Sequence, residues 1–401
     1  MLRLTVAIAV VGVALLSGVP ARRYNQGAIS EGMNVQATGG NLGPEKHSCS
    51  TFLLPAGDTL LVGHNVDDDY VIPGAVVVNK HGVQKESTSW EADLLTLFGR
   101  SHKAPRARWT SKYGSITYNT FGKEGPDGGM NEAGLYVGEM TLTQVPTVPP
   151  KNDLPKMYPH LWIQYLLDNY ATVDEVIASL EAVSPGGPQT WHFFIADRQG
   201  HTAAIEFLEG GTAIYKNKEM PVKVMTNPPY AQEMEKLRGY EGFGGQAAVD
   251  LDDRNSYRGF VWAAALLDAY ATSGATDAVA YAFDVLEALE WDNNQWAVVY
   301  DVHKERMYFR TAQAHRIRFI DMSRFDFSCE TPAMMLDIQQ DLEGDVSGSF
   351  VPHTDKLNKA FIKAAIKPIE IPGMPKFAGD IFKFFWADRL HRYTKGFSCA
   401  P

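Results

Sequence analysis

The sequence predicts an α+β fold, because its predicted strands come in blocks and its predicted helices in pairs, without regular alternation. The chain has 401 residues and 45% hydrophobic content, which suffices for one large domain or two ordinary ones. Lys and Arg total 37 against 47 Asp and Glu, for a net charge of -10. A phosphate backbone is repelled by such a chain, so we expect no nucleic-acid partner.

The beginning of the chain reads as an export signal over residues 1–21. Arg3 supplies a positive start, an apolar run covers residues 4–16, and small residues follow at 19–21. The run is short for a bilayer span; an uncleaved anchor is the alternative. Residues 22–48 show no period and read as a propeptide. We expect a secreted or periplasmic protein without membrane contact.

Ordered elements are expected from Cys49 onward. A hairpin joins strands at 49–54 and 59–63, and strands at 116–119 and 134–138 flank a glycine-rich loop at 125–129. Helices are expected at 161–170 and from Thr172, where a capping box opens an apolar stripe reaching Val183. Further predicted elements are a meander (191–196, 201–207, 212–215), a strand (222–226), helices (257–270, 277–289) and strands (296–300, 307–310, 316–320).

Three cysteines are an odd number for an exported chain. Cys329 and Cys399 both lie in the last quarter and are able to pair, which leaves Cys49 free. The alternative is that all three are buried thiols.

Cys49 stands where the unpatterned leader meets the first predicted strand. A cut between Ser48 and Cys49 creates an α-amine of pKa about 7.7 to 8.0 beside a thiol of about 8.5, so that one residue holds both nucleophile and base. With Ala56 and Gly57 as a two-residue turn, Cys49 is expected opposite His64, give or take one residue. The segment 64–67 then surrounds the thiol, and Asp67 is placed to orient the amine.

Other catalytic motifs are missing from the sequence. It has no Walker-type phosphate loop, His-Glu-x-x-His, Cys-x-x-Cys or Gly-x-Ser-x-Gly. Asp67, Asp68 and Asp69 lack the ligand spacing of a calcium loop, and we expect Asp68 and Asp69 to form a solvated strand end. We therefore expect neither a cofactor nor a metal.

Six blocks of sequence, in order, resemble the choloylglycine hydrolase family, which includes bile salt hydrolases and penicillin V acylases. The blocks are residues 49–52 (CSTF), 63–67 (GHNVD), 130–135 (MNEAGL), 162–169 (WIQYLLDN), 226–230 (TNPPY) and 256–260 (SYRGF). The resemblance implies an N-terminal-nucleophile (Ntn) hydrolase: an αββα sandwich of two stacked antiparallel sheets flanked by helices, over residues 49–325. It implies hydrolysis of a linear amide through a thioester. It also implies that the protein matures by autoproteolysis.

The resemblance also implies roles for individual residues. Cys49 matches the nucleophile and Asp67 the carboxylate that holds its amine. Asn227 matches the side-chain donor of the oxyanion hole, and a residue before proline holds such a donor stiffly. At Thr141 the family has Asn or Tyr, so only the main-chain amide carries over. Arg258 is offset by one residue from the family arginine.

His64 stands where the family usually has arginine. A histidine with an ordinary pKa of about 6.5 is mostly neutral at pH 7 and provides no fixed positive charge. We expect the pH profile of kcat/KM of the wild type to show an ionisation near that pKa that is missing from the profile of His64→Gln.

Two other functions stay open. One is an acyltransferase of the isopenicillin-N type, which passes the acyl group to another amine. The other is a non-enzymatic exported binding protein with a structural Cys49. For the hydrolase we expect a small-molecule N-acyl amide substrate with an apolar acyl group. The loop 145–150 is expected to line part of the pocket that binds this group.

Residues 326–401 lie outside the resemblance and are expected to complete the domain or pack on it. There, Phe384, Phe385 and Trp386 occur among Lys383, Arg389 and Arg392. We expect this stripe to pack against its own domain; a membrane surface or a partner subunit in a homo-oligomer is the alternative.

Overall fold

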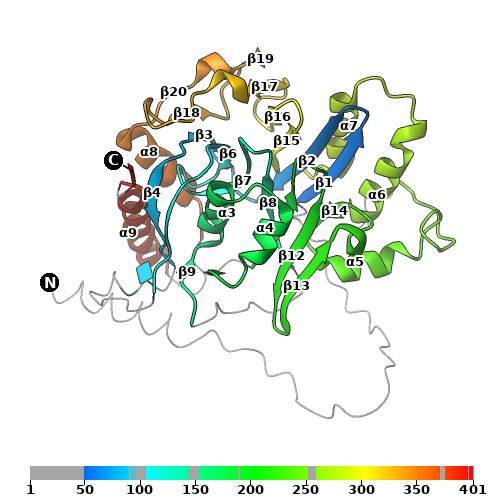
Figure 1. The fold of residues 1–401 in the computed structure, drawn as a ribbon, viewed down its shortest axis with the longest axis horizontal. Helices are drawn as coiled ribbons and strands as arrows, with labels where there is room; N and C mark the ends of the chain where they lie inside the picture. Colours follow the sequence, from blue (N-terminus) through cyan, green and yellow to red (C-terminus); the bar gives the residue numbers. More distant parts are fainter. Residues whose placement is uncertain are drawn as a thin grey trace, which may run out of the picture.

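The computed structural model describes residues 49–89, 92–93, 95, 105–143, 153–187, 190–251, 259–370, 375–395 and 397–400. The predicted signal peptide and propeptide lie outside these ranges. Two sheets stack face to face and helices cover both outer faces, so the described chain forms four layers (Figure 1). This is the expected α+β sandwich.

The first sheet has seven strands, of which all but the last pair are antiparallel. Its order is β14 (Val224–Met225), β1 (Ser50–Ala56), β2 (Thr59–Asp67), β15 (Asn294–Asp301), β16 (Arg306–Thr311), β17 (Arg318–Asp321) and β19 (Gly344–Asp345). The predicted hairpin is confirmed as β1–β2, and the predicted strands at 296–300, 307–310 and 316–320 are confirmed as β15, β16 and β17 with shifted ends.

The predicted register of the β1–β2 hairpin is wrong by two residues. Ala56 pairs with Thr59, so the turn is Gly57–Asp58 and not Ala56–Gly57. Gly57 has φ +62, a conformation that glycine adopts without steric cost at the first turn position. His64 therefore pairs with Thr51, and the same ladder, continued, places Cys49 opposite Val66.

The second sheet has nine antiparallel strands. Its order is β13 (Gly211–Lys216), β12 (Thr202–Leu208), β11 (Trp191–Ala196), β8 (Tyr136–Thr141), β7 (Pro126–Asn131), β6 (Ser115–Asn119), β3 (Ala75–Asn79), β18 (Met334–Asp337) and β20 (Val351–Pro352). The predicted meander is confirmed as β11–β12–β13. Two small sheets, β9 (Lys156–Met157) with β10 (Ser184–Pro185) and β21 (Ser398–Cys399) with β4 (Val83–Glu86) and β5 (Arg108–Thr110), lie beside it.

The glycine-rich segment 125–129 was expected to be a loop, but most of it lies in β7. Gly128 and Gly129 pair there with Gly138 and Val137 of β8. A Cβ atom on Gly129 would lie 2.6 Å from the main-chain oxygen of Ile116. The glycines therefore serve close strand approach, which the sequence pattern did not distinguish from a flexible loop.

Helices cover both outer faces. The predicted pair of helices is confirmed as α3 (Pro159–Asn169) and α4 (Val173–Ala178), which pack on the nine-stranded sheet. The capping box at Thr172 is present, although α4 ends at Ala178 and does not continue to Val183. The outer face of the seven-stranded sheet carries α5 (Tyr230–Leu237), α6 (Gly259–Ala269) and α7 (Ala278–Leu289).

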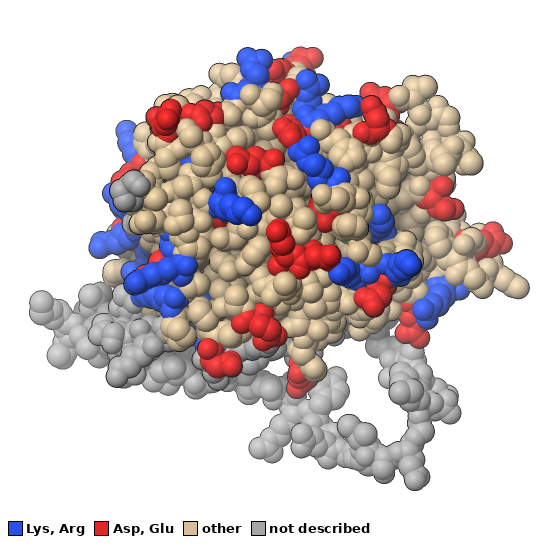
Figure 2. Space-filling model, viewed as in Figure 1, with Lys and Arg blue, Asp and Glu red and all other residues tan. Residues whose placement is uncertain are grey.

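The C-terminal part adds strands β18, β19 and β20 and the helices α8 (Asp355–Ile366) and α9 (Lys376–Thr394). The two helices pack through Ile362, Ile366 and Trp386. They lie at the left of Figure 1, and Lys and Arg side chains are frequent along the same edge in Figure 2. Within the described ranges, no helix is long and apolar enough to cross a membrane.

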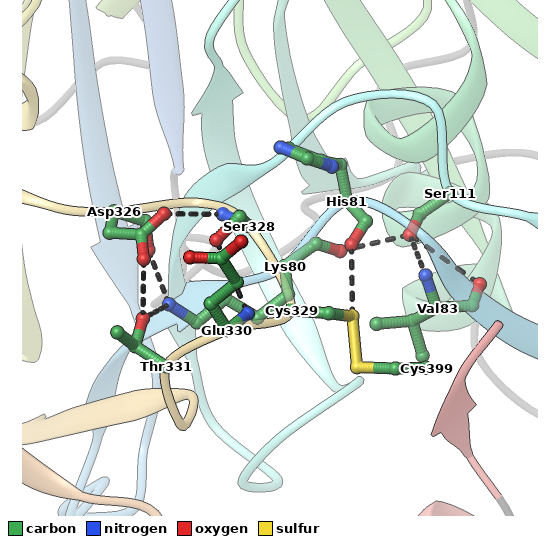
Figure 3. The surroundings of a disulfide bond; sticks show 10 residues. All are labelled: Lys80, His81, Val83, Ser111, Asp326, Ser328, Cys329, Glu330, Thr331 and Cys399. Carbon is green, nitrogen blue, oxygen red and sulfur yellow. Dashed lines mark hydrogen bonds between the residues drawn. A yellow bond between two sulfur atoms is a disulfide. The ribbon is translucent and has the colours of Figure 1, made fainter. Parts of the chain in front are cut away.

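A disulfide joins Cys329 to Cys399 and leaves Cys49 as a free, buried cysteine, which confirms the pairing considered from the sequence. The bond lies beside the loop that follows β3, where the Cys329 sulfur is 3.3 Å from the main-chain oxygen of His81 (Figure 3). Ala400 donates a main-chain hydrogen bond to Gly82, and β21 pairs with β4. The last residues are therefore attached to the central body by both a covalent bond and strand pairing.

Candidate active site

Three neighbouring strands of the seven-stranded sheet bring Cys49, Asp67 and Asn227 to one edge. Cys49 directly precedes β1 and is 4% exposed. Its Sγ lies 3.7 Å from the main-chain oxygen of Asp67, the last residue of β2. On the other side of β1, Thr51 pairs with Met225, and the ladder, continued by two residues, places Asn227 opposite Cys49. The sheet register alone thus assembles these three predicted site residues.

The carboxylate of Asp67 is held by β15. Asp67 is buried, and its Oδ1 accepts a hydrogen bond of 2.9 Å from Asn294 Nδ2. The neighbouring Gln295 donates to the main-chain oxygen of Asp68 and accepts from the main-chain nitrogen of Ile72. These two amides fix the end of β2 and the segment after it.

Sequence reasoning missed the role of Asn294 and Gln295. Their signal was the polar run 292–295 placed directly before a predicted strand. Asp69 is exposed as expected, but Asp68 is partly buried and its Oδ1 accepts from the main-chain nitrogen of Tyr70. The prediction of a solvated strand end is therefore wrong for Asp68.

The two groups predicted for an oxyanion hole come to the same edge from different sheets. Asn227 is fully buried, and its main-chain oxygen accepts a 3.0 Å hydrogen bond from the main-chain nitrogen of Thr143. Thr141 is the last residue of β8, two positions before Thr143, and pairs with Trp191. The Thr143 hydrogen bond thereby joins the chain just after β8 to Asn227, the second residue after β14.

His64 is buried between the two sheets. It lies in β2 opposite Thr51, is 2% exposed, and its Nδ1 is 3.0 Å from the hydroxyl of Tyr136. Burial lowers the pKa of His64 to about 4. The ionisation expected near 6.5 is therefore wrong, and at neutral pH the ring is uncharged. Tyr136, which the sequence did not single out, fixes the orientation of the ring.

Two glycines without side chains leave the space that the His64 ring occupies against β7 and β8. A Cβ atom on Gly128 or Gly138 would lie 3.3 or 3.2 Å from its Nδ1. These paired glycines in β7 and β8 were the sequence signal for a side chain inserted between the sheets.

Burial and nearby acidic side chains disfavour ionisation of the thiol. Burial raises the pKa of Cys49 well above its ordinary value, and Glu139 and Asp67 raise it further. Glu139, in β8, is itself buried, and burial next to Asp127 raises its own pKa well above the usual range. The thiol is therefore protonated at neutral pH in this environment, and its use as a nucleophile requires a base close by.

Two of the predicted features lie outside the described residues: Arg258 and the loop 145–150. In the part of the chain that the structure describes, no group of three or more His, Cys, Asp or Glu side chains is arranged to hold a metal ion.

Comparison with known proteins adds independent information. Residues 110–335 match the sequence profile of the linear amide C–N hydrolases, choloylglycine hydrolase family. A penicillin V acylase from Pectobacterium atrosepticum is 27% identical over 291 residues, which cover 61% of this chain and 77% of that protein.

Solved structures show the same fold. Penicillin V acylase from Agrobacterium tumefaciens superposes with a TM-score of 0.65 at 22% identity, covering 76% of this chain and 98% of the other. A variant of conjugated bile acid hydrolase from Clostridium perfringens gives a TM-score of 0.56 at 18% identity, covering 72% and 97%. The fold is therefore that of the Ntn hydrolases.

Proposed function

The chain belongs to the choloylglycine hydrolase family of linear amide C–N hydrolases, and from this premise we propose that Cys49 is the nucleophile and that the reaction passes through a thioester. The enzyme acts on small-molecule N-acyl amides, as its family does. The observation that carries the proposal is the convergence of Cys49, Asp67 and Asn227 on one sheet edge. Membership of this family leaves no support for the non-enzymatic alternative.

The reaction begins with cleavage of the peptide bond between Ser48 and Cys49. The freed α-amine of Cys49 then takes the proton of its own thiol, which burial and the nearby acidic side chains otherwise keep protonated. Asp67, fixed by Asn294, accepts a hydrogen bond from that amine and sets its position. The base and the thiol then belong to the same residue, so the α-amine lies next to the proton that it accepts.

The thiolate attacks the amide carbonyl, and a negative charge develops on its oxygen. The side-chain amide of Asn227 and the main-chain amide of Thr141 are the donors that stabilise this oxyanion. The protonated α-amine gives its proton to the leaving amine, and the acyl group stays on sulfur as a thioester. A water molecule, deprotonated by the same amine, then attacks the thioester and releases the acid.

His64 and Arg258 enter the proposal differently. His64 is neutral at working pH, so it does not stabilise the thiolate by charge. Its ring contacts the Tyr136 hydroxyl and has a structural role in the proposal. Arg258, which the resemblance assigns to the site, lies outside the described residues and is given no step in the reaction. Export to the periplasm or the exterior, with autoproteolytic removal of residues 22–48, belongs to the same proposal.

The test combines maturation and turnover in one protein preparation. Intact mass and N-terminal sequencing of the active protein are expected to show Cys49 as the first residue. Hydrolysis of penicillin V and of a conjugated bile acid is measured, and the thioester is trapped by acid quenching and mass spectrometry. Asn227→Ala is expected to lower kcat by about a hundred- to a thousandfold, because one oxyanion donor is worth about 3 to 4 kcal/mol.

Cys49→Ala is expected to remove both turnover and the trapped adduct. An active protein in which the leader is still joined to Cys49, or full activity in Cys49→Ala, would overturn the proposal. An adduct on another residue would overturn the assignment of the nucleophile alone.

A further inference from the structure

Helix α9 exposes large aromatic side chains on its outer side. Phe377, Phe384 and Phe385 are 73%, 60% and 44% exposed, and in the described part of the chain they are the exposed phenylalanines. Phe384 and Phe385 contact each other edge to face. The expectation that this stripe packs on its own domain is confirmed for Trp386, which is 8% exposed, and is wrong for its two neighbours.

Helical geometry explains the division. Phe377 and Phe384 are seven residues, about two turns, apart and lie on one side of α9, and Phe385 lies at the margin of that side, about 100° further round the helix. Trp386 lies opposite Phe377 and Phe384, and together with Phe382 it packs with Ile362 and Ile366 of α8. The helix is therefore aromatic on two sides, and one of them has no covering element among the described residues.

The same part of the chain carries a charge opposite to that of the rest. Residues 355–401 contain nine Lys or Arg against four Asp or Glu, a net charge of +5, in a chain whose total is -10. The preceding residues therefore carry -15. The positive charge is concentrated on the segment that also exposes the phenylalanines.

The basic side of α8 borders the aromatic side of α9. Lys359 pairs with Asp388 at 3.0 Å, and Lys383 donates to the main-chain oxygen of Lys367 at 3.0 Å, so the two helices run side by side. Exposed lysines at 356, 363 and 367 recur at helical spacing next to Lys359. We define the aromatic-basic face as Phe377, Phe384 and Phe385 with Lys356, Lys363 and Lys367.

We propose that the aromatic-basic face binds the surface of membranes that contain anionic lipids. The phenyl rings enter the boundary between headgroups and acyl chains, and the lysines contact the anionic headgroups. The charge distribution favours this occupant, because an anionic surface repels the rest of the protein and so orients it with α8 and α9 facing the membrane. A second copy is disfavoured, because a twofold contact would oppose two faces of the same positive charge.

The experiment measures flotation of the purified protein with vesicles. Vesicles of phosphatidylcholine alone are compared with vesicles that also contain phosphatidylglycerol, at low and at high salt. We expect binding to the anionic vesicles at low salt, weaker binding at high salt, and little binding to phosphatidylcholine alone. Failure to bind the anionic vesicles at low salt overturns the proposal.

Variants of the aromatic side test its contribution. The triple variant Phe377→Ser, Phe384→Ser, Phe385→Ser is expected to bind anionic vesicles more than about tenfold more weakly, because three apolar groups no longer enter the interface. The matched control Leu251→Ser with Ile317→Ser removes exposed apolar side chains elsewhere and is expected to bind like the wild type. Equal binding by the triple variant and the wild type overturns the proposal.

Variants of the basic side test the charge. Lys363→Gln with Lys367→Gln is expected to weaken binding by roughly 25-fold at low salt, since each lysine near an anionic surface adds about fivefold. The control Lys218→Gln with Lys304→Gln makes the same charge change outside the face and is expected to have a smaller effect. Sedimentation velocity without lipid completes the test: a dimer that the triple phenylalanine variant dissociates, with no change in flotation, assigns the face to a second copy and overturns the proposal.

Discussion

The burial of His64 predicts how the stability of the protein depends on pH. The folded-state pKa of His64 is about 4, whereas its ordinary value is 6.5. Between these values the unfolded chain binds more protons at this residue than the folded chain does. The free energy of unfolding should therefore fall as the pH falls from about 6.5 to about 4, and the contribution of His64 should be fully present above that window.

The difference between the two pKa values sets the size of the effect. At 1.36 kcal/mol for each pH unit, it amounts to about 3 kcal/mol between pH 7 and pH 4. His64→Gln removes the titrating group and keeps a polar side chain near the Tyr136 hydroxyl. The variant should thus lose about 3 kcal/mol less stability than the wild type over the same pH change.

Urea unfolding of both proteins at pH 7 and pH 4 measures this difference. Other buried groups also titrate, among them His160 with a pKa lowered to about 4 and Asp127 with a pKa raised to about 7. They contribute equally to both proteins, so the difference between the two losses isolates His64. Equal losses would refute the assignment of a buried, neutral histidine. The pH profile of kcat/KM should likewise show no His64-dependent step near 6.5.

Three further changes have defined outcomes. Asn294→Ala removes the donor to Asp67 and should lower kcat by about ten- to a hundredfold with little change in KM, as measured by initial rates. Gly129→Ala should lower the free energy of unfolding by about 2 to 3 kcal/mol because its Cβ meets a neighbouring strand, whereas Gly210→Ala, with open space around it, should be nearly neutral in the same urea titration. Cys329→Ser opens a 70-residue loop and should lower the free energy of unfolding by about 4 kcal/mol; unchanged unfolding midpoints would contradict a stabilising bond.

Local sequence patterns predicted the elements whose partners are close along the chain. The β1–β2 hairpin, the meander and the capping box at Thr172 depend on neighbouring residues, and each is present. The turn was misplaced by one residue, because Ala56–Gly57 and Gly57–Asp58 both contain the glycine that the turn needs. That small error moved the expected partner of Cys49 from Val66 to His64.

Features that depend on distant partners could not be derived from local pattern. The glycines of β7 look like a loop until the neighbouring strands and the His64 ring are in place. The pKa of His64 depends on burial between two sheets, which its own strand does not reveal. Asn294, nearly 230 residues after Asp67, reaches it only because β15 pairs with β2. The resemblance to a known family supplied Asn227 and Thr141 before any geometry did.

The convergence of β14, β1 and β2 also sets how the enzyme tolerates change. A slip of one residue between β1 and either neighbour would move Cys49 by about 3.3 Å and turn its side chain to the other face. Insertions in the tight turn after Ala56 are therefore expected to silence the enzyme while leaving a folded protein.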